Sequence, residues 1–290
     1  MNLSHKCLIL FAIIMLNLTF KIAGQENISS ELRFINHMLG RQNYNEALFL
    51  LENLQAETTG KKDTVNYLIG WTLYGQKELK TSAYYLSLVS ENSPWFEKSR
   101  FFAAYNHAYL QETKKSRELL GFFNEDFSEQ VIIMKNFQIA GIALLERKLD
   151  EFVYRAENFK GNFSITASEE RKLNEYYERI SQQPSRSPFV AGIMSAAVPG
   201  LGRIYAGKTA EGISSFLYVG ALLATSWDLY NRLGRNSPFF MISASLSGIF
   251  YVGNIWGSAV AVNRVQREFN YEMDQRILLD MHIPLRKLFP

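Results

Sequence analysis

The sequence has 290 residues and a mass of 33.3 kDa, more than one small domain requires, which suggests about two domains. Its charges are unevenly distributed, because residues 25–185 carry 19 basic and 22 acidic side chains while residues 186–290 carry 10 and 6. A net charge of +3 without a long basic run argues against nucleic acid as a partner. An aromatic content of 14% excludes a disordered chain.

Residues 1–24 have the pattern of a secretory signal peptide. Lys6 precedes an apolar run from Cys7 to Leu16, and small residues close the segment. We therefore expect an exported protein whose mature chain begins near Gln25. An uncleaved membrane anchor is the alternative, because Lys21 and Ile22 make a poor cleavage site. Cys7 is the only cysteine, so we expect no disulfide and no cysteine metal site in the mature chain.

From Ile28 to Ile180, apolar residues recur every three or four positions, which predicts a run of amphipathic helices. The run also repeats itself, with equivalent positions at Ala47, Ser82, Ser116 and Phe152. These positions are 35, 34 and 36 residues apart, and the segments around them resemble tetratricopeptide repeats of about 34 residues. The resemblance implies a helical-repeat solenoid, which we place at residues 25–181.

Repeats of this family display the first helix of each unit on a concave face. In the family's register that face carries five aromatic residues: Tyr67, Trp71, Tyr74, Phe101 and Tyr105. We expect these residues to bind an apolar or proline-rich segment of a protein partner. The alternative, that they fill the core between helices, stays open. Some family members clamp a C-terminal carboxylate with charged side chains, but Tyr67 and Trp71 stand at those positions here.

After a linker at residues 182–188 the composition changes. Three stretches lack charged side chains: 187–202, 212–227 and 236–263. The last has 28 residues, more than the roughly 20 needed to cross a bilayer. The second crosses if it extends to Tyr230, whereas the first is short and contains Pro199, so we expect a kinked or half-inserted helix. We predict an all-α protein in which the solenoid precedes a small transmembrane bundle at residues 189–263, with two or three hydrophobic helices and a polar tail at 264–290. A buried helical hairpin of a soluble domain is the alternative.

The segment from Ser195 to Gly212 resembles the Pro-Gly-x-Gly-x-x-Tyr-x-Gly signature of small bacterial membrane domains related to the two-transmembrane domain family. The matching positions, with the following lysine and last glycine, are Pro199, Gly200, Gly202, Tyr205, Gly207, Lys208 and Gly212. The resemblance implies no established reaction. We expect a tight turn without a ligand, in which Tyr205 can lie at the membrane interface and Lys208 can meet lipid phosphate.

Residues Gly202 to Thr209 also fit the phosphate-binding loop pattern. That loop requires a preceding buried strand and a downstream magnesium site, for which the remaining membrane-like sequence leaves little room. We therefore expect no bound nucleotide despite the motif. The histidines His37, His107 and His282 have no clustered partners in the sequence, so we predict no metal site, no catalytic residue and no cofactor.

These features predict a non-enzymatic, membrane-anchored adaptor in the cytoplasmic (inner) membrane of a bacterium. Its repeat domain would lie on the exported, periplasmic side and bind a protein partner, and its bundle would contact membrane lipid. The alternative is an accessory factor in membrane-protein insertion or transport that acts through the membrane domain. The side of the C-terminus stays open, because two crossings leave Arg264 and Arg267 outside and three crossings place them in the cytoplasm.

Overall fold

The computed structural model describes residues 30–290 except 58–60, 160 and 162, so the predicted signal peptide lies outside the described residues. The described residues form helices and no strand, which confirms the all-α class. The chain divides into two compact units. Unit 1 extends to Leu173 and also includes Leu278–Pro290, here called the C-terminal segment, whereas unit 2 is Asn174–Ile277.

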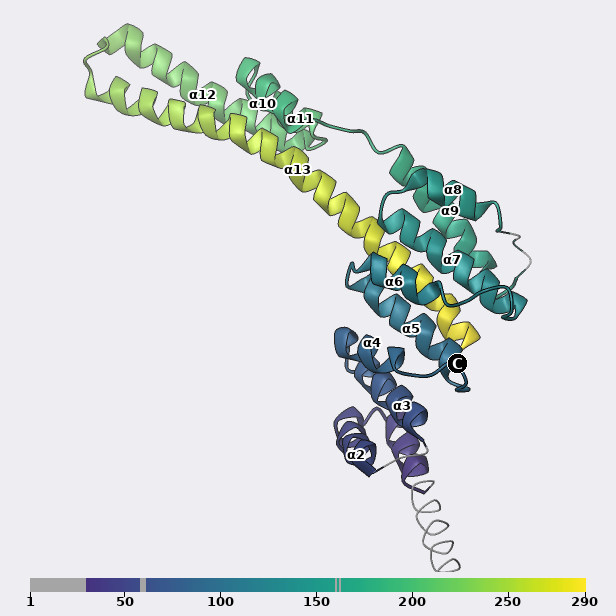
Figure 1. Ribbon diagram of the computed structural model, residues 1–290. Helices are drawn as coiled ribbons and strands as arrows, with labels where there is room; N and C mark the ends of the chain where they lie inside the picture. The colour runs from purple at the N-terminus through teal and green to yellow at the C-terminus, as the bar shows by residue number, and fades with distance from the viewer. Residues whose placement is uncertain (1–29, 58–60, 160, 162) are drawn as a thin grey trace, which may run out of the picture. The chain divides into compact units, whose positions relative to one another are not determined.

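Unit 1 is built from short helices that follow one another along the chain (Figure 1). Residues 30–40 are helical. The next helices are α2 (Tyr44–Glu57), α3 (Lys62–Gly75), α4 (Leu79–Ser87), α5 (Phe96–Tyr109), α6 (Thr113–Leu120), α7 (Glu129–Leu145) and α8 (Leu149–Ala156), and α9 (Ala167–Ser181) continues into unit 2. Each helix from α2 to α5 packs against the next one, and α7 packs against α8. Most of these contacts are therefore local in sequence.

One turn geometry recurs between these helices. Gln42, Lys77, Gln111 and Arg147 all have positive φ, at 62°, 66°, 62° and 59°. They are 35, 34 and 36 residues apart. Each lies five residues before one of the four equivalent positions of the internal repeat. Non-glycine residues rarely adopt this conformation, so its recurrence marks the same tight connection four times. The sequence period therefore corresponds to a recurring local structure.

Small residues allow the paired helices to approach closely. The Ser82 hydroxyl donates to the Gly70 carbonyl at 2.7 Å, and Ser116 donates to the Ala104 carbonyl at the same distance. A Cβ on Gly70 would lie 2.6 Å from Leu86 Cγ, so glycine leaves room for that leucine. The two equivalent serines thus satisfy equivalent carbonyls in successive helix pairs. In the next pair Phe152 replaces the serine and is buried.

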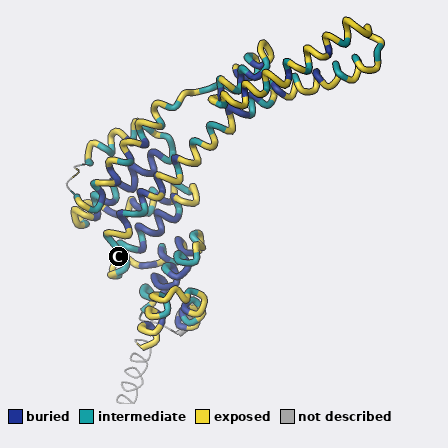
Figure 2. The backbone as a smooth tube through the Cα atoms, turned by 180° about the vertical axis from the view of Figure 1, so that it is seen from behind, coloured by how far each residue is buried: buried dark blue, intermediate teal, exposed yellow. Residues whose placement is uncertain are grey.

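The core of unit 1 is aromatic as well as aliphatic. Its largest fully buried side chains include five phenylalanines: Phe101, Phe102, Phe123, Phe137 and Phe152. Phe101 stacks on Phe123 with ring centroids 4.4 Å apart. Burying a side chain of this size contributes about 1.5–3 kcal/mol, so each of these five rings adds to the driving force for folding unit 1. Figure 2 shows this buried interior along the helices of unit 1.

Unit 2 consists of two short helices and two long ones. These are α10 (Pro188–Ala197), α11 (Leu201–Tyr205), α12 (Thr209–Leu233) and α13 (Pro238–Leu288), whose last turns belong to unit 1. The 51-residue α13 is the one helix of the described chain that is long and apolar enough to cross a membrane. Only 11% of its most apolar 18-residue window is buried, so it does not resemble the core helix of a soluble protein.

The interior of unit 2 combines a small apolar cluster with buried polar side chains. Its interior contains hydroxyl pairs: Ser195 and Ser258 oxygens lie 2.7 Å apart, and Ser226 lies 2.7 Å from Ser243 and 2.8 Å from Ser247. Many large apolar side chains are exposed, among them Phe189, Leu217, Tyr218, Trp227, Phe239, Ile242, Ile249, Val252 and Trp256. Yellow therefore dominates α12 and the first half of α13 in Figure 2.

Candidate functional site

The predicted aromatic residues lie on two helices of unit 1. Tyr67, Trp71 and Tyr74 are four and three residues apart on α3, a spacing that places them on one helix face. Trp71 stacks on Tyr74 at 5.4 Å between centroids and meets the edge of Phe102 on α5 at 5.0 Å. Tyr67, Phe101 and Tyr105 are buried and belong to the core of unit 1.

The C-terminal segment packs against these same residues. The His282 ring stacks on Tyr105 at 5.0 Å between centroids, and its Nε2 forms a hydrogen bond with the Tyr74 hydroxyl. The ring centroids of Phe289 and Phe101 lie 5.6 Å apart, and the Arg286 guanidinium lies 5.4 Å from the centre of a Trp71 ring. The aromatic residues that we expected to bind a partner therefore contact the chain's own C-terminal segment, and their role toward a partner stays a prediction.

Apolar contacts and backbone geometry hold the C-terminal segment in place. Met281 and Leu285 are fully buried. The Met281 sulfur occupies the space above Gly141 on α7, where a Cβ would lie only 2.5 Å from it. Pro284 has no N–H to donate within α13, and the Gln138 side chain donates to the nearby Met281 carbonyl at 2.8 Å.

Two ion pairs add polar contacts between the C-terminal segment and α9. Lys172 Nζ lies 2.8 Å from Asp280 Oδ1, and Lys287 Nζ lies 3.3 Å from Glu169 Oε2. Asp280 and Glu169 are nearly fully buried, so an unpaired carboxylate at either place would be costly. The segment is therefore held by specific contacts with α3, α5, α7 and α9.

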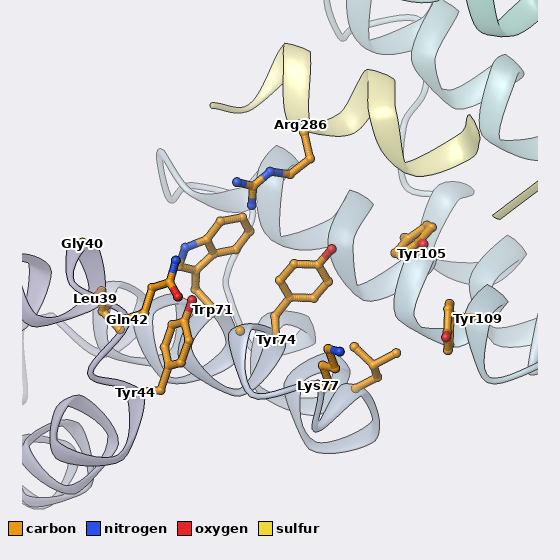
Figure 3. A pocket seen from close by; sticks show the side chains of 12 residues that line it. Leu39, Gly40, Gln42, Tyr44, Trp71, Tyr74, Lys77, Tyr105, Tyr109 and Arg286 are labelled. Carbon is orange, nitrogen blue, oxygen red and sulfur yellow. The ribbon is translucent and has the colours of Figure 1, made fainter. Parts of the chain in front are cut away.

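A cavity of about 760 Å³ remains open beside this contact, as Figure 3 shows. Its lining comes from the N-terminal helices, from α3 and α5 and from the C-terminal segment: Leu39, Gly40, Gln42, Tyr44, Trp71, Tyr74, Gly75, Lys77, Leu79, Tyr105, Tyr109 and Arg286. We call it the aromatic cavity. Its lining includes five aromatic side chains and two cations but no acidic side chain.

The electrostatics of the aromatic cavity are those of a neutral aromatic wall with positive charge beside it. Burial raises the pKa of Tyr67 and Tyr74 to about 12, with the opposing effect of Arg286 smaller, and burial also raises the pKa of Tyr105. These hydroxyls therefore stay protonated and contribute no negative charge. Burial, and then Arg286, lowers the pKa of Lys98, whose Nζ lies 4.3 Å from the centre of a Trp71 ring.

The chemistry of the aromatic cavity is that of binding. Aromatic faces offer apolar contact area, and Arg286 and Lys77 offer charge-assisted hydrogen bonds to an anion. No group of three or more histidine, cysteine, aspartate or glutamate side chains that could hold a metal occurs among the described residues. The arrangement therefore suits an anionic group attached to an apolar one.

The signature glycines of unit 2 form a close-packed turn. Gly200 has φ of 85°, and a Cβ there would lie 2.0 Å from the Gly212 carbonyl oxygen. A Cβ on Gly202 would lie 1.9 Å from the Ala191 carbonyl oxygen. These contacts are with backbone atoms, which cannot rotate away. Pro199 and Gly200 separate α10 from α11, and the glycines allow α10, α11 and α12 to touch through their backbones.

The polar signature residues have partners within unit 2. The Tyr205 hydroxyl accepts a hydrogen bond from the Ser187 N–H at 3.1 Å. Lys208 Nζ lies 3.4 Å from Glu268 Oε2, and a Cβ on Gly207 would lie 2.8 Å from Arg186 Nη1. The turn therefore contacts the residues just before α10 and the α13 residue Glu268. The expected contacts of Tyr205 and Lys208 with the membrane interface stay predictions.

The segment that fits the phosphate-binding loop pattern has a different structure from such a loop. It follows helix α10, and its first glycine lies inside α11. The Gly202 N–H donates to Ser195 Oγ at 3.0 Å, and the Gly207 N–H donates to the Ile204 carbonyl at 2.9 Å. A phosphate-binding loop points its N–H groups at the ligand, whereas these two groups bond within the chain.

Sequence analysis missed the residues that the C-terminal segment contributes, above all His282 and Arg286. A signal was present, because Ile277, Met281 and Leu285 are four residues apart and mark an apolar helix face. Pro284 obscured this signal, since proline usually ends a helix.

Comparison of the chain with known protein families, with curated protein sequences and with solved structures found no match in any of the three.

Proposed function

We propose that this protein is a non-enzymatic, membrane-anchored adaptor. In this proposal unit 1 is a tetratricopeptide-like solenoid that binds a protein partner in the aromatic cavity, and unit 2 is a transmembrane bundle. The membrane is the cytoplasmic membrane of a bacterium, and unit 1 lies on its periplasmic side. The aromatic cavity with its uncompensated positive charge is the observation that carries the binding function.

The surface of unit 2 supports its placement in lipid. Many large apolar side chains of α12 and α13 are exposed, and large exposed apolar surfaces are rare in soluble proteins. Helix α12 has 25 residues and is about 37 Å long, so by length alone it can cross a hydrocarbon layer of about 30 Å, whereas α13 is also apolar enough. Interior serines that bond to one another suit helices surrounded by lipid, where polar side chains join neighbouring helices.

Unit 1 contains chain segments from before and after unit 2, which supports an even number of membrane crossings. The C-terminal segment belongs to the same compact unit as α2–α8, so both must lie on one side of a membrane crossed between them. Helix α10 has 10 residues, about 15 Å, and is too short to cross. A hairpin of α12 and α13 meets both conditions. It places Arg232 and Arg235, near the connection between these helices, in the cytoplasm, as the positive-inside rule expects, whereas Arg264 and Arg267 lie outside, against the rule.

The lining of the aromatic cavity indicates the chemistry of the partner. Arg286 and Lys77 favour a carboxylate, and the rings of Trp71 and Tyr74 favour an apolar or aromatic neighbour. The proposed ligand is therefore an acidic segment of another protein with an apolar side chain next to the acid. This refines the expected apolar or proline-rich segment, because the cavity combines aromatic rings with positive charge.

A binding experiment with the detergent-solubilised full chain tests this function. Two labelled peptides that alternate phenylalanine with glutamate or with glutamine are compared by fluorescence anisotropy. We expect the glutamate peptide to bind at least about tenfold more tightly, and Arg286→Gln to remove most of the difference. Arg276→Gln is the matched control, because Arg276 is also on α13 but pairs with Glu272 and does not line the cavity. Equal binding of both peptides, or no binding of either, would contradict the proposed site.

A further inference from the structure

Unit 2 contains a second cavity, of about 410 Å³, which no part of the proposed function uses. It is formed by α11, α12 and α13, and its lining is Arg203, Ser215, Tyr218, Val219, Ile249, Phe250, Gly253 and Asn254. We call it the Arg203 cavity. Its volume falls within the range of small-molecule sites, about 300–1,000 Å³.

Arg203 brings a positive charge to this cavity with little compensation. Its Nη1 lies 4.0 Å from Glu211 Oε2, at the limit of an ion pair and beyond hydrogen-bond distance. Its Nε is buried and has no hydrogen-bond partner among the described residues. A Cβ on Gly257 would lie 2.8 Å from Nη2, so the glycine makes room for the guanidinium. A charge held in this way in apolar surroundings favours an anion as its partner.

Asn254 contributes the complementary polar atom. Its side chain is only 4% exposed, and its Oδ1 has no hydrogen-bond partner among the described residues. Its Nδ2 donates to the Ser195 carbonyl at 3.5 Å, which leaves Oδ1 as the unsatisfied end of the amide. Arg203 and Asn254 both line the cavity, and each has one buried polar atom without a partner among the described residues, Nε and Oδ1, which costs free energy.

The remaining lining indicates that the ligand also has an apolar part. Val219 is buried, whereas Tyr218, Ile249 and Phe250 are exposed on the outer surface of α12 and α13. The cavity is thus continuous with the apolar surface that we place in lipid. A ligand that reaches Arg203 from this surface needs an anionic group, a hydrogen-bond donor near it and hydrocarbon to cover the outer rings.

We propose that the Arg203 cavity binds one anionic phospholipid with a glycerol-type headgroup. The phosphodiester accepts hydrogen bonds from the Arg203 guanidinium, a headgroup hydroxyl donates to Asn254 Oδ1, and an acyl chain lies along Ile249 and Phe250. This inference rests on the proposed membrane placement of unit 2.

The test compares lipids on the full chain purified in mild detergent. Native mass spectrometry measures retention of phosphatidylglycerol and of phosphatidylcholine with the same acyl chains. We expect phosphatidylglycerol to be retained at least about tenfold better, and Arg203→Gln to abolish this preference. Arg203→Lys keeps the charge but loses the fork of donors, so it should keep only part of the preference. Arg232→Gln is the matched control, because Arg232 is exposed and pairs with Asp228 away from the cavity.

Two further measurements make the outcome decisive. Circular dichroism and elution volume show whether each variant is folded, and only folded variants are compared. Inorganic phosphate at the same concentration should leave the melting temperature unchanged, since it lacks the apolar part. Equal retention of the two lipids by the unaltered chain, or an unchanged preference in Arg203→Gln, would overturn the lipid site.

Flotation of the full chain with phosphatidylcholine vesicles separates this inference from the proposed function. A chain that floats with these vesicles but does not prefer phosphatidylglycerol disproves the lipid site alone. A chain that does not float with any vesicles disproves the membrane placement and the lipid site together.

Discussion

The two units of this protein differ in the large side chains that they bury. Unit 1 encloses phenylalanines such as Phe101 and Phe137 and has ion pairs at its surface, whereas unit 2 encloses Ser195, Asn254 and Ser258 and exposes its largest apolar side chains. In water, apolar burial drives folding, but in lipid it offers no preference, and close backbone contact with polar pairing takes its place. Under the proposed membrane placement of unit 2, the two all-α units are therefore stabilised by different balances of forces.

The largest expected effect concerns the glycines of the turn in unit 2. Gly202→Ala places a Cβ 1.9 Å from the Ala191 carbonyl oxygen, a backbone atom, so we expect a loss of at least about 3 kcal/mol of stability. In unit 1, Gly70→Ala meets mainly the Leu86 side chain, which can move, and should cost less. The melting temperature of the detergent-solubilised chain measures both effects.

Gly220→Ala is the control for the turn glycines, because nothing lies within 4 Å of the position of its Cβ. It should leave the melting temperature unchanged or slightly raised. If Gly202→Ala were as harmless as Gly220→Ala, the close backbone packing of unit 2 would be refuted.

The second prediction is that an arginine at an exposed position is costly in unit 2 but not in unit 1. Val252 in unit 2 and Tyr84 in unit 1 are 65% and 60% exposed. Val252→Arg should reduce membrane integration by about 3 kcal/mol, because an arginine in hydrocarbon is costly. Tyr84→Arg should change stability by less than about 0.5 kcal/mol, because that position faces water. Carbonate extraction of membranes measures integration, and equal retention of both variants would remove the contrast between the units.

The third prediction concerns an ion-pair cluster between α6 and α8. Arg117 lies 2.8 Å from Glu146 and 2.6 Å from Glu151, and its hydrogen bond and charge, with those of nearby groups, lower the pKa of Glu146 to about 2 against opposing burial. Arg117→Gln should cost about 1–3 kcal/mol at pH 7. Because the folded pKa is lowered, this stability is present above pH 4.5 and is lost as the pH falls toward 2. Urea unfolding at pH 7 and pH 3 should show a smaller difference between variant and parent at pH 3.

The smallest effect is expected where the C-terminal segment packs against α3 and α5. Burial, and then Arg286, lowers the pKa of His282, which faces Tyr74, Phe102 and Tyr105. The contact is therefore strongest above pH 6.5 and weakens as the pH falls below it, because the free histidine binds protons more readily. Hydrogen exchange of residues 278–288 should accelerate on going from pH 7.5 to 5.5, after correction for the intrinsic rate. His282→Asn should lack this change, and a variant with the same pH dependence as the parent would contradict the role of His282.

The local features of the fold could be predicted from the sequence. Helical periodicity predicted the all-α class, and the spacing of Ala47, Ser82, Ser116 and Phe152 matches the recurring turns, because both depend on residues close together in the chain. The docking of the C-terminal segment could not be predicted in this way. Met281 meets Gln138 across 143 residues, and no local pattern specifies such a pairing.

The candidate site could be predicted only in part. The aromatic side of the cavity follows from the positions of Trp71 and Tyr74 on α3, but its charge depends on Arg286, which comes from the other end of the chain. In unit 2 the glycines stood out in the sequence. The unpaired atoms of Arg203 and Asn254 become apparent only in three dimensions, since they belong to different helices.

The long separation between Tyr74 and His282 has a consequence for biosynthesis. These residues are 208 positions apart, and all of unit 2 is synthesised between them. The ribosome therefore releases α3 and α5 long before the residues that cover their aromatic side chains exist. During that interval the nascent domain is incomplete, and its exposed aromatic surface can bind chaperones or aggregate. Completion of unit 1 thus has to wait until all of unit 2 has been translated.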